Sequence, residues 1–218
     1  VKRSYVQTAS LLDELYTSGT KDANEITDLG AVITQDSVSF KLWAPTAQKV
    51  TLLLFNQDKT PAATGRLEMT EDTATGTWSA KAGVEYSAAY YQYQISVYHP
   101  VSKRVETLTT TDPYSLSLST NSEHSQVVDL SHPDTQPNGW TEQKDNLVNN
   151  PEDNIFYETH IRDFSAHDAK LSDARVRGKY GAFSEQNSDG IKHLKSLRQA
   201  GINNIHLLPT FDIGTVNE

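Results

Sequence analysis

Four ionisable residues stand close together in the middle of the chain and are the first candidates for chemistry. Glu158, His160, Arg162 and Asp163 lie within six positions, directly after the apolar residues 155–157. Two carboxylates can act together as nucleophile and acid when they stand about 5 Å apart. Glu158 and Asp163 would be roughly 16 Å apart along one strand and on opposite faces. We therefore exclude them as a catalytic pair.

Each candidate in this region has a structural alternative. Arg162 and Asp163 either line a ligand cleft or form an ion pair that ties the strand to another segment. His160 is either a hydrogen-bonded buried histidine or part of a cleft wall. His206 stands in the middle of a second apolar run, 202–209, and we expect it to pack in the core.

The three tryptophans are candidates for stacking on the apolar face of an uncharged ligand. Trp78 follows the turn 75–77 and is the best of them, although a place in the core remains the alternative. We expect Trp43 to be buried or packed at a domain interface, because it points away from the Leu42 face. Trp140 lies in a polar connector, which we expect it to fix in place.

Composition excludes several classes of function. The chain of 218 residues carries 28 acidic and 19 basic residues, a net charge of -9, and no basic run, which argues against nucleic acid and anionic membranes. It has no cysteine, and no apolar stretch is long enough for a membrane span. The acids of the connector (Asp129, Asp134, Asp145 and Asp153) are scattered without the spacing of a calcium loop, so we predict no metal site among them.

Two patterns position these residues. From 30 to 129 the apolar residues alternate with period two, most clearly in 38–42, 50–54 and 89–98, which predicts a small antiparallel β-sandwich. From 154 to 218 a buried strand (154–165), a loop (166–188), a helix after the cap Ser188 and before the stop Gly201, and a second strand (202–209) predict a βαβ unit. The segment 10–16 predicts a short helix with Ser10 as its N-cap.

The predicted domains are thus an N-terminal helix and linker (1–28), a β-sandwich (29–130), a connector (131–153) and the start of a (β/α)8 barrel (154–218). The fold class is mostly β: an antiparallel immunoglobulin-like β-sandwich followed by a first β-α-β segment. Barrel active sites lie at the carboxyl ends of the strands. Our candidate substrate-binding residues are therefore Tyr157, His160, Arg162 and Asp163 after the first strand, Phe211 and Asp212 after the second, and Trp78 in the sandwich.

Five segments in order resemble a known family. FKLWAPTAQKV (40–50), YYQYQISV (90–97) and TDPYSL (111–116) are similar to the family 48 carbohydrate-binding-type sandwich that precedes the barrel of starch debranching enzymes. IFYETHIRDFS (155–165) and the stretch 190–212 resemble the first strands of a glycoside hydrolase family 13 barrel. The ending TFDIGTVNE (210–218) is more like pullulanases than like isoamylases or branching enzymes.

This resemblance implies hydrolysis of α-1,6 branch linkages in pullulan, starch and related α-glucans by a retaining two-carboxylate mechanism. In the family the nucleophilic Asp, the acid Glu and a further essential Asp follow the fourth, fifth and seventh barrel strands. The sequence stops after the second strand, so no catalytic residue can be assigned, and we expect this segment alone to be inactive. An eight-stranded barrel needs about 250 residues, whereas 154–218 supplies far fewer.

We therefore hypothesise that the chain is the N-terminal part of a longer enzyme. The expected partners are an α-glucan substrate and the remainder of the barrel, in the same polypeptide or as a separate chain. The resemblance implies no cofactor in this segment, with calcium open for the whole enzyme, and a secreted or cell-surface location, with a cytoplasmic one not excluded. The alternative is a free-standing α-glucan-binding or structural sandwich without enzyme activity.

Overall fold

The protein divides into two compact units, with the division between Pro137 and Asn138. The structure is a computed structural model that describes residues 8–17, 22–142, 148 and 150–210. No helix among these residues is long and apolar enough to cross a membrane.

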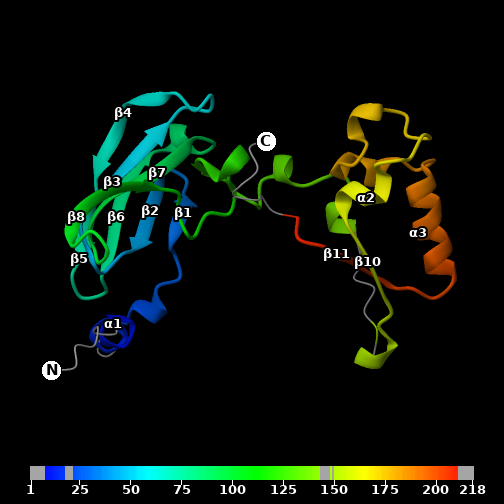
Figure 1. The fold of residues 1–218 in the computed structure, drawn as a ribbon. Coiled ribbons are helices and arrows are strands. Elements are labelled where there is room, and N and C mark those ends of the chain that lie inside the picture. Colours follow the sequence, from blue (N-terminus) through cyan, green and yellow to red (C-terminus); the bar gives the residue numbers. More distant parts are fainter. Residues whose placement is uncertain (1–7, 18–21, 143–147, 149, 211–218) are drawn as a thin grey trace. The chain divides into compact units, whose positions relative to one another are not determined.

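The first unit is built from two antiparallel sheets (Figure 1). One sheet has the strand order β1-β2-β6-β5, and the other has the order β4-β3-β7-β8, with the short β9 also paired to β7. The strands are β1 (Gly30–Ile33), β2 (Ser37–Trp43), β3 (Ala47–Phe55), β4 (Pro61–Glu68), β5 (Thr70–Asp72), β6 (Thr77–Gly83), β7 (Tyr90–His99), β8 (Arg104–Thr110) and β9 (Ser125–Gln126). The predicted antiparallel sandwich is confirmed.

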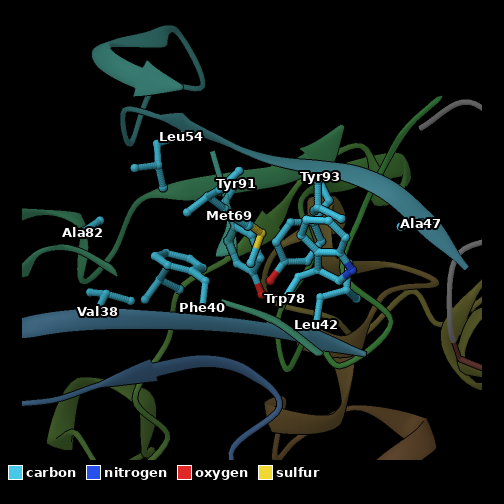
Figure 2. Packing of buried hydrophobic residues seen from close by; sticks show 13 residues of the cluster. Val38, Phe40, Leu42, Ala47, Leu54, Met69, Trp78, Ala82, Tyr91 and Tyr93 are labelled. Atoms are coloured by element: carbon cyan, nitrogen blue, oxygen red, sulfur yellow. The ribbon is translucent and has the colours of Figure 1, made fainter. Parts of the chain in front are cut away.

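The core lies between these two sheets because alternate residues of each strand point inward. Figure 2 shows Val38, Phe40 and Leu42 of β2 facing residues of the opposite sheet, among them Tyr91 and Tyr93 of β7. The rings of Phe40 and Tyr91 meet edge to face at 5.0 Å between centroids. The period-two pattern therefore predicted the inward faces of β2 and β7 correctly.

Helix α1 (Thr8–Tyr16) precedes the sandwich, and a short 3-10 helix (Ala23–Glu25) follows it. The prediction that Ser10 caps this helix is wrong, because the helix already includes Thr8 and Ser10 lies within it. Further 3-10 helices occupy Val84–Tyr86, Thr120–Ser122 and Pro133–Thr135. The last of these begins the segment that we predicted as an irregular connector.

The second unit contains one parallel strand pair, β10 (Phe156–Thr159) and β11 (Asn204–Leu207). Between them lie α2 (Ile161–Ser165) and α3 (Asp189–Gln199), and the 3-10 helices Ala174–Val176 and Tyr180–Ser184 lie within the predicted loop. Two more 3-10 helices, Trp140–Glu142 and Pro151–Asp153, precede β10. The strand, helix, strand order of a βαβ unit is present as predicted.

The ends of α3 follow the chemistry that the sequence predicted. Ser188 caps the helix, since its Oγ accepts the backbone N–H of Ile191 at 3.2 Å. After the helix, Gly201 has a φ of 106°, a left-handed conformation that favours glycine. Both the predicted start and the predicted stop of this helix are confirmed.

Asparagine side chains fix the register at the amino ends of β10 and β11. Asn203 Oδ1 accepts the backbone N–H of Ile155 at 2.8 Å, and Asn203 Nδ2 donates to the carbonyl of Asp153 at 2.9 Å. Asn204 Nδ2 donates to Asn154 Oδ1 at 2.8 Å. These bonds join residues about fifty positions apart and hold the two strands side by side.

Candidate functional site

The carboxyl ends of β10 and β11 form the candidate site, and α3 covers one face of this strand pair. The ring of Tyr157 packs edge to face on the ring of His193 in α3, at 5.6 Å between centroids. Tyr157 is paired in register with Ile205, so both residues point to this face. This contact holds the half-buried ring of Tyr157 against the helix, and its role as a ligand contact stays a prediction.

The opposite face of the strand pair carries Glu158 and His206. These residues are register partners, and Oε2 of Glu158 lies 3.1 Å from Nδ1 of His206. The side chains are 58% and 64% exposed, respectively. The prediction that His206 packs in the core is wrong for the part of the chain that the structure describes, because His206 alternates with residues of the α3 face. The sequence did not suggest this pair, since it depends on register across the sheet.

His160 ends the first strand and starts a helix. It has an extended backbone, with φ -101° and ψ 137°, and its Nδ1 accepts the backbone N–H of Arg162 at 3.0 Å as the N-cap of α2. Our prediction of one strand over 154–165 is therefore wrong, since β10 ends at Thr159. A side-chain acceptor at this position satisfies a free N–H of the first helical turn, which favours a helix over an extended chain.

Arg162 and Asp163 lie on α2, directly after the carboxyl end of β10. Arg162 Nε stands 3.2 Å from Asp163 Oδ1, and the side chains are 73% and 66% exposed. The two residues form the predicted ion pair, but it joins neighbours in sequence and ties no strand to another segment. Exposed pairs of this kind add little stability. Both side chains remain accessible, and their role as ligand contacts stays a prediction.

Trp78 is only 6% exposed and belongs to the sandwich core. Its Nε1 donates to the carbonyl of Ala44 at 3.1 Å, and its register partner is the buried Leu42. The prediction of Trp78 as a sugar platform is wrong, because a buried ring has no free face. Trp43 is half-buried and donates to the carbonyl of Thr75 at 2.9 Å. Trp140 is 60% exposed, which disagrees with its expected role of fixing the connector.

Phe211 and Asp212, the candidates after the second strand, lie outside the described residues. The last described residue, Thr210, accepts a hydrogen bond from the hydroxyl of Tyr180 at 2.6 Å. Tyr180 comes from the long segment between β10 and α3, so this segment contacts the carboxyl end of β11. Its side chain is exposed, and sequence reasoning did not select it as a site residue.

A buried carboxylate fixes the start of α3 beside this site. Asp168 accepts the backbone N–H groups of Gly190 at 3.0 Å and Lys170 at 2.9 Å. These bonds, first that from Gly190, lower the pKa of Asp168.

Aromatic packing also joins α2 to this region. Phe164 of α2 stacks on Phe183 at 4.0 Å between centroids, and a Cβ on Gly190 would meet the Phe164 ring at 2.7 Å. The segment after β10 is thus packed tightly onto the helix.

A second candidate site lies on the outer face of the sandwich, at one end of β3 and β7. Phe55 and Tyr90 are register partners that point away from the core. The ring of His124 packs edge to face on Phe55 at 4.6 Å and on Tyr90 at 6.2 Å, and Nζ of Lys59 lies 5.9 Å from the Tyr90 ring centre. Burial lowers the pKa of His124, and its Nδ1 has no hydrogen-bond partner among the described residues. We call Phe55, Lys59, Tyr90 and His124 the outer aromatic cluster. The alternation of 89–98 placed tyrosines on both faces, but nothing in the sequence marked this one.

A resident metal does not fit the described part of the chain. Within it there is no group of three or more His, Cys, Asp and Glu side chains that could hold a metal ion.

Comparison with known proteins connects both units to one group of enzymes. Residues 28–115 match the family of carbohydrate-binding module 48, also described as the isoamylase N-terminal domain. A pullulanase of Klebsiella pneumoniae is 41% identical across the whole of this chain, and pullulanase 1, chloroplastic, of Arabidopsis thaliana is 37% identical over 98% of it. The chain is homologous to part of the pullulanases. It spans only about a fifth of the length of these relatives, 20% and 21%.

Solved pullulanase structures agree with this assignment. Ligand-free PulA from Klebsiella pneumoniae superimposes with a TM-score of 0.86 and 43% identity, over 95% of this chain and 19% of that one. The pullulanase of Bacillus acidopullulyticus superimposes with a TM-score of 0.76 and 33% identity, over 95% and 24% of the two chains. Another Klebsiella pneumoniae pullulanase structure is a complex with maltotriose. The resemblance predicted from five short segments is confirmed.

Proposed function

We propose that this chain is the N-terminal portion of a pullulanase-type glycoside hydrolase, which cleaves α-1,6 branch linkages in pullulan, starch and related α-glucans. The observation that carries this proposal is the similarity to pullulanases along the whole chain, 41% identity for the Klebsiella pneumoniae relative. The activity belongs to a protein longer than this segment, because the relatives are about five times its length.

In this proposal the second unit begins a (β/α)8 barrel. Its β10 and β11 are parallel, α3 covers one face, and the other face carries the Glu158–His206 pair. Large apolar side chains of the strands remain open to solvent in this chain, with exposed fractions of 64% for Phe156 and 39% for Leu207. Further strands at both edges would bury these side chains and pair the open backbone groups.

The chemistry in such a barrel would be a retaining displacement by two carboxylates. By resemblance, those carboxylates follow later strands than the two in this chain. The contribution of the present residues is to shape the cleft at the carboxyl ends of the first two strands. His160, Arg162 and Asp163 lie there, and the cation and the carboxylate are accessible for hydrogen bonds to sugar hydroxyls.

The proposal is tested by measuring reducing ends released from pullulan. We expect release by the polypeptide extended beyond Glu218 through the remaining barrel, and none by residues 1–218 alone. Mixing residues 1–218 with a separately produced remainder tests assembly from two chains, and we expect activity to return if the two parts pair. Failure of the extended polypeptide to cleave pullulan, while it is folded, would refute the proposed activity.

We also propose that the sandwich binds α-glucan through the outer aromatic cluster. Sugars bind proteins through C–H groups on aromatic rings and through hydrogen bonds, and the cluster offers two rings, an imidazole and a cation. Maltotriose is the natural probe, because a related pullulanase has been solved with it. Calorimetric titration of residues 1–218 should show saturable binding that Tyr90→Ala abolishes.

Tyr98→Ala is the matched control for this titration. Tyr98 lies on the same strand and the same outer face as Tyr90, but eight residues away, and it is 54% exposed. We expect its replacement to leave maltotriose binding unchanged. Equal loss in both variants, or no binding by the parent chain, would contradict the proposed cluster. The free-standing sandwich without enzyme activity is not favoured, because the similarity to pullulanases continues through β11.

Two further parts of the proposal rest on the resemblance alone. One is a secreted or cell-surface location, which fractionation of the source cells would test. The other is calcium in the complete enzyme, held by residues beyond the described ones. Activity of the extended polypeptide before and after chelation tests this second part.

A further inference from the structure

The turn at Asn138 and Gly139 contains the only Asn-Gly sequence of the chain. Asn138 is exposed, and Gly139 has a φ of 79°. A side chain at Gly139 would meet nothing closer than Glu142 Oε2 at 4.0 Å, so the backbone there is open. Among the described residues, neither the amide of Asn138 nor the N–H of Gly139 forms a hydrogen bond. The side chain and the following backbone nitrogen are therefore free to approach each other.

At two comparable sequences, Asn187-Ser188 and Asp189-Gly190, hydrogen bonds restrain the following backbone N–H. At Asn187, the next residue, Ser188, is buried, and its N–H donates to the carbonyl of Glu185 at 2.9 Å. At Asp189, the N–H of Gly190 donates to Asp168 Oδ2 at 3.0 Å. Asn150 precedes proline, which has no N–H.

Lys170 adds a second restraint at Asp189. Its Nζ holds Asp189 Oδ1 at 2.7 Å, so the carboxylate as well as the following N–H is engaged. Asp189 also lies in the first turn of α3, where the backbone is fixed in the helical conformation. The sequence Asp-Gly alone would have suggested a second reactive position, and the structure removes it.

We propose that Asn138 is a site of spontaneous deamidation and isoaspartate formation. The Gly139 nitrogen loses its proton to base and attacks Cγ of Asn138; a C–N bond forms, the Cγ–Nδ2 bond breaks, and ammonia leaves. Water then opens the resulting succinimide. Opening at Cγ gives aspartate, whereas opening at the backbone carbonyl gives isoaspartate, in which the main chain runs through Cβ. Glycine permits the attack because it has no side chain to crowd the nitrogen.

The position gives this modification a structural consequence. Asn138 is the first residue of the second unit, directly after the division that follows Pro137. Either product adds one negative charge to a chain that already carries a net charge of -9. Isoaspartate also lengthens the main chain by one carbon atom. The change therefore falls at the first residue of the second unit, next to Gly139, whose carbonyl accepts the N–H of Glu142 at 3.1 Å.

The test is to incubate residues 1–218 in mildly alkaline buffer and to follow two readouts. Peptide mass mapping should show the amide-to-acid mass increase at Asn138 well before any at Asn187. A protein isoaspartyl methyltransferase should transfer methyl groups to the aged chain at this same peptide. Asn138→Gln keeps an amide but disfavours ring closure, so it should stop both signals at this position. The far-ultraviolet circular dichroism of this exposed variant should match that of the parent chain.

A denatured sample separates the sequence effect from the structural one. In urea the bonds that protect Asn187 and Asp189 are lost, so their modification should accelerate relative to that of Asn138. The proposal is overturned if Asn187 reacts as fast as Asn138 in the folded chain, or if Asn138 stays unmodified. It is also overturned if Asn138→Gln accepts methyl groups at the same peptide as readily as the parent chain.

Discussion

A buried carboxylate in the sandwich permits a quantitative test of the fold. Asp112 is 4% exposed, and its Oδ2 accepts the hydroxyl of Tyr91 at 2.8 Å and the hydroxyl of Tyr93 at 3.3 Å. Its Oδ1 accepts the backbone N–H of Tyr114 at 2.8 Å, and its own N–H donates to Ser125 Oγ at 2.8 Å. The side chain and backbone of this one residue thus join β7, β9 and the loop after β8.

The hydrogen bonds from Tyr91 and Tyr93 to Asp112 differ in length, so their removal should lower the free energy of unfolding by different amounts. A hydrogen bond to a charged group contributes about 1.5–3 kcal/mol, and a weaker one about 0.5–1.5 kcal/mol. We therefore expect Tyr91→Phe to lower the free energy of unfolding by about 2 kcal/mol and Tyr93→Phe by about 1 kcal/mol. Asp112→Ala leaves two buried hydroxyls without their acceptor, each costing about 1–3 kcal/mol, and should be the most destabilising of the three.

The pH dependence has a definite sign. Burial raises the pKa of Asp112, although the bonds from Tyr114, Tyr91 and Tyr93 oppose the rise. The folded state therefore holds a proton more tightly than the unfolded state. The contribution of this group to stability is largest below its ordinary pKa of about 3.9 and is lost as pH rises through the raised value. Asp112→Asn has no such titration, so its free energy of unfolding relative to the parent should rise over that interval.

Urea unfolding of residues 1–218, followed by near-ultraviolet circular dichroism, measures these differences, because Tyr91, Tyr93 and Trp78 are packed in the same core. Tyr86→Phe is a control, since the Tyr86 hydroxyl contacts only the exposed Thr64 among described residues, at 3.3 Å. If Tyr93→Phe lowers the free energy of unfolding by as much as Tyr91→Phe or more, the ranking of the two hydrogen bonds by their lengths is refuted. If the free energies of unfolding of the parent and of Asp112→Asn change in parallel with pH, the pH dependence does not come from the raised pKa of Asp112.

Three smaller predictions concern the second unit. Ser188→Ala removes the cap that accepts the N–H of Ile191 and should lower the free energy of unfolding by about 1 kcal/mol in urea unfolding. Gly190→Ala places a methyl group 2.7 Å from the Phe164 ring and should lower the thermal midpoint of this unit; an unchanged midpoint would contradict the packing. Asp163→Asn should leave the unfolding midpoint unchanged within error, because its ion pair is exposed.

The sequence predicted the sandwich well where alternation was strong. β2, β3 and β7 carry apolar residues at every second position, and their inward faces were assigned correctly. β4 was missed because Pro61 and Gly65 interrupt a run of small and polar residues, although proline fits the first position of an edge strand. β9 has two residues, too few for any periodic signal.

The candidate site was predicted less well, for a physical reason. Alternation separates Tyr157 from Glu158, but it does not say which of the two faces the helix covers. That choice depends on contacts such as the one between Tyr157 and His193. The prediction that Trp78 binds substrate was wrong for the same reason, because only the register of Trp78 with Leu42 shows that its side chain points inward.

The Glu158–His206 pair shows what pairing register adds to a pattern. In the sequence, each of these polar residues stands alone in an apolar strand. The sequence alone therefore favours a solvated Glu158 and a His206 packed in the core. In register they form a 3.1 Å pair on the face opposite α3, one residue before each strand ends. A barrel closed around this face would remove both side chains from water, and buried polar groups without enough hydrogen-bond partners destabilise a fold. If the proposed barrel exists, its later strands must therefore offer polar groups to Glu158 and His206, at the level where such barrels hold their active sites.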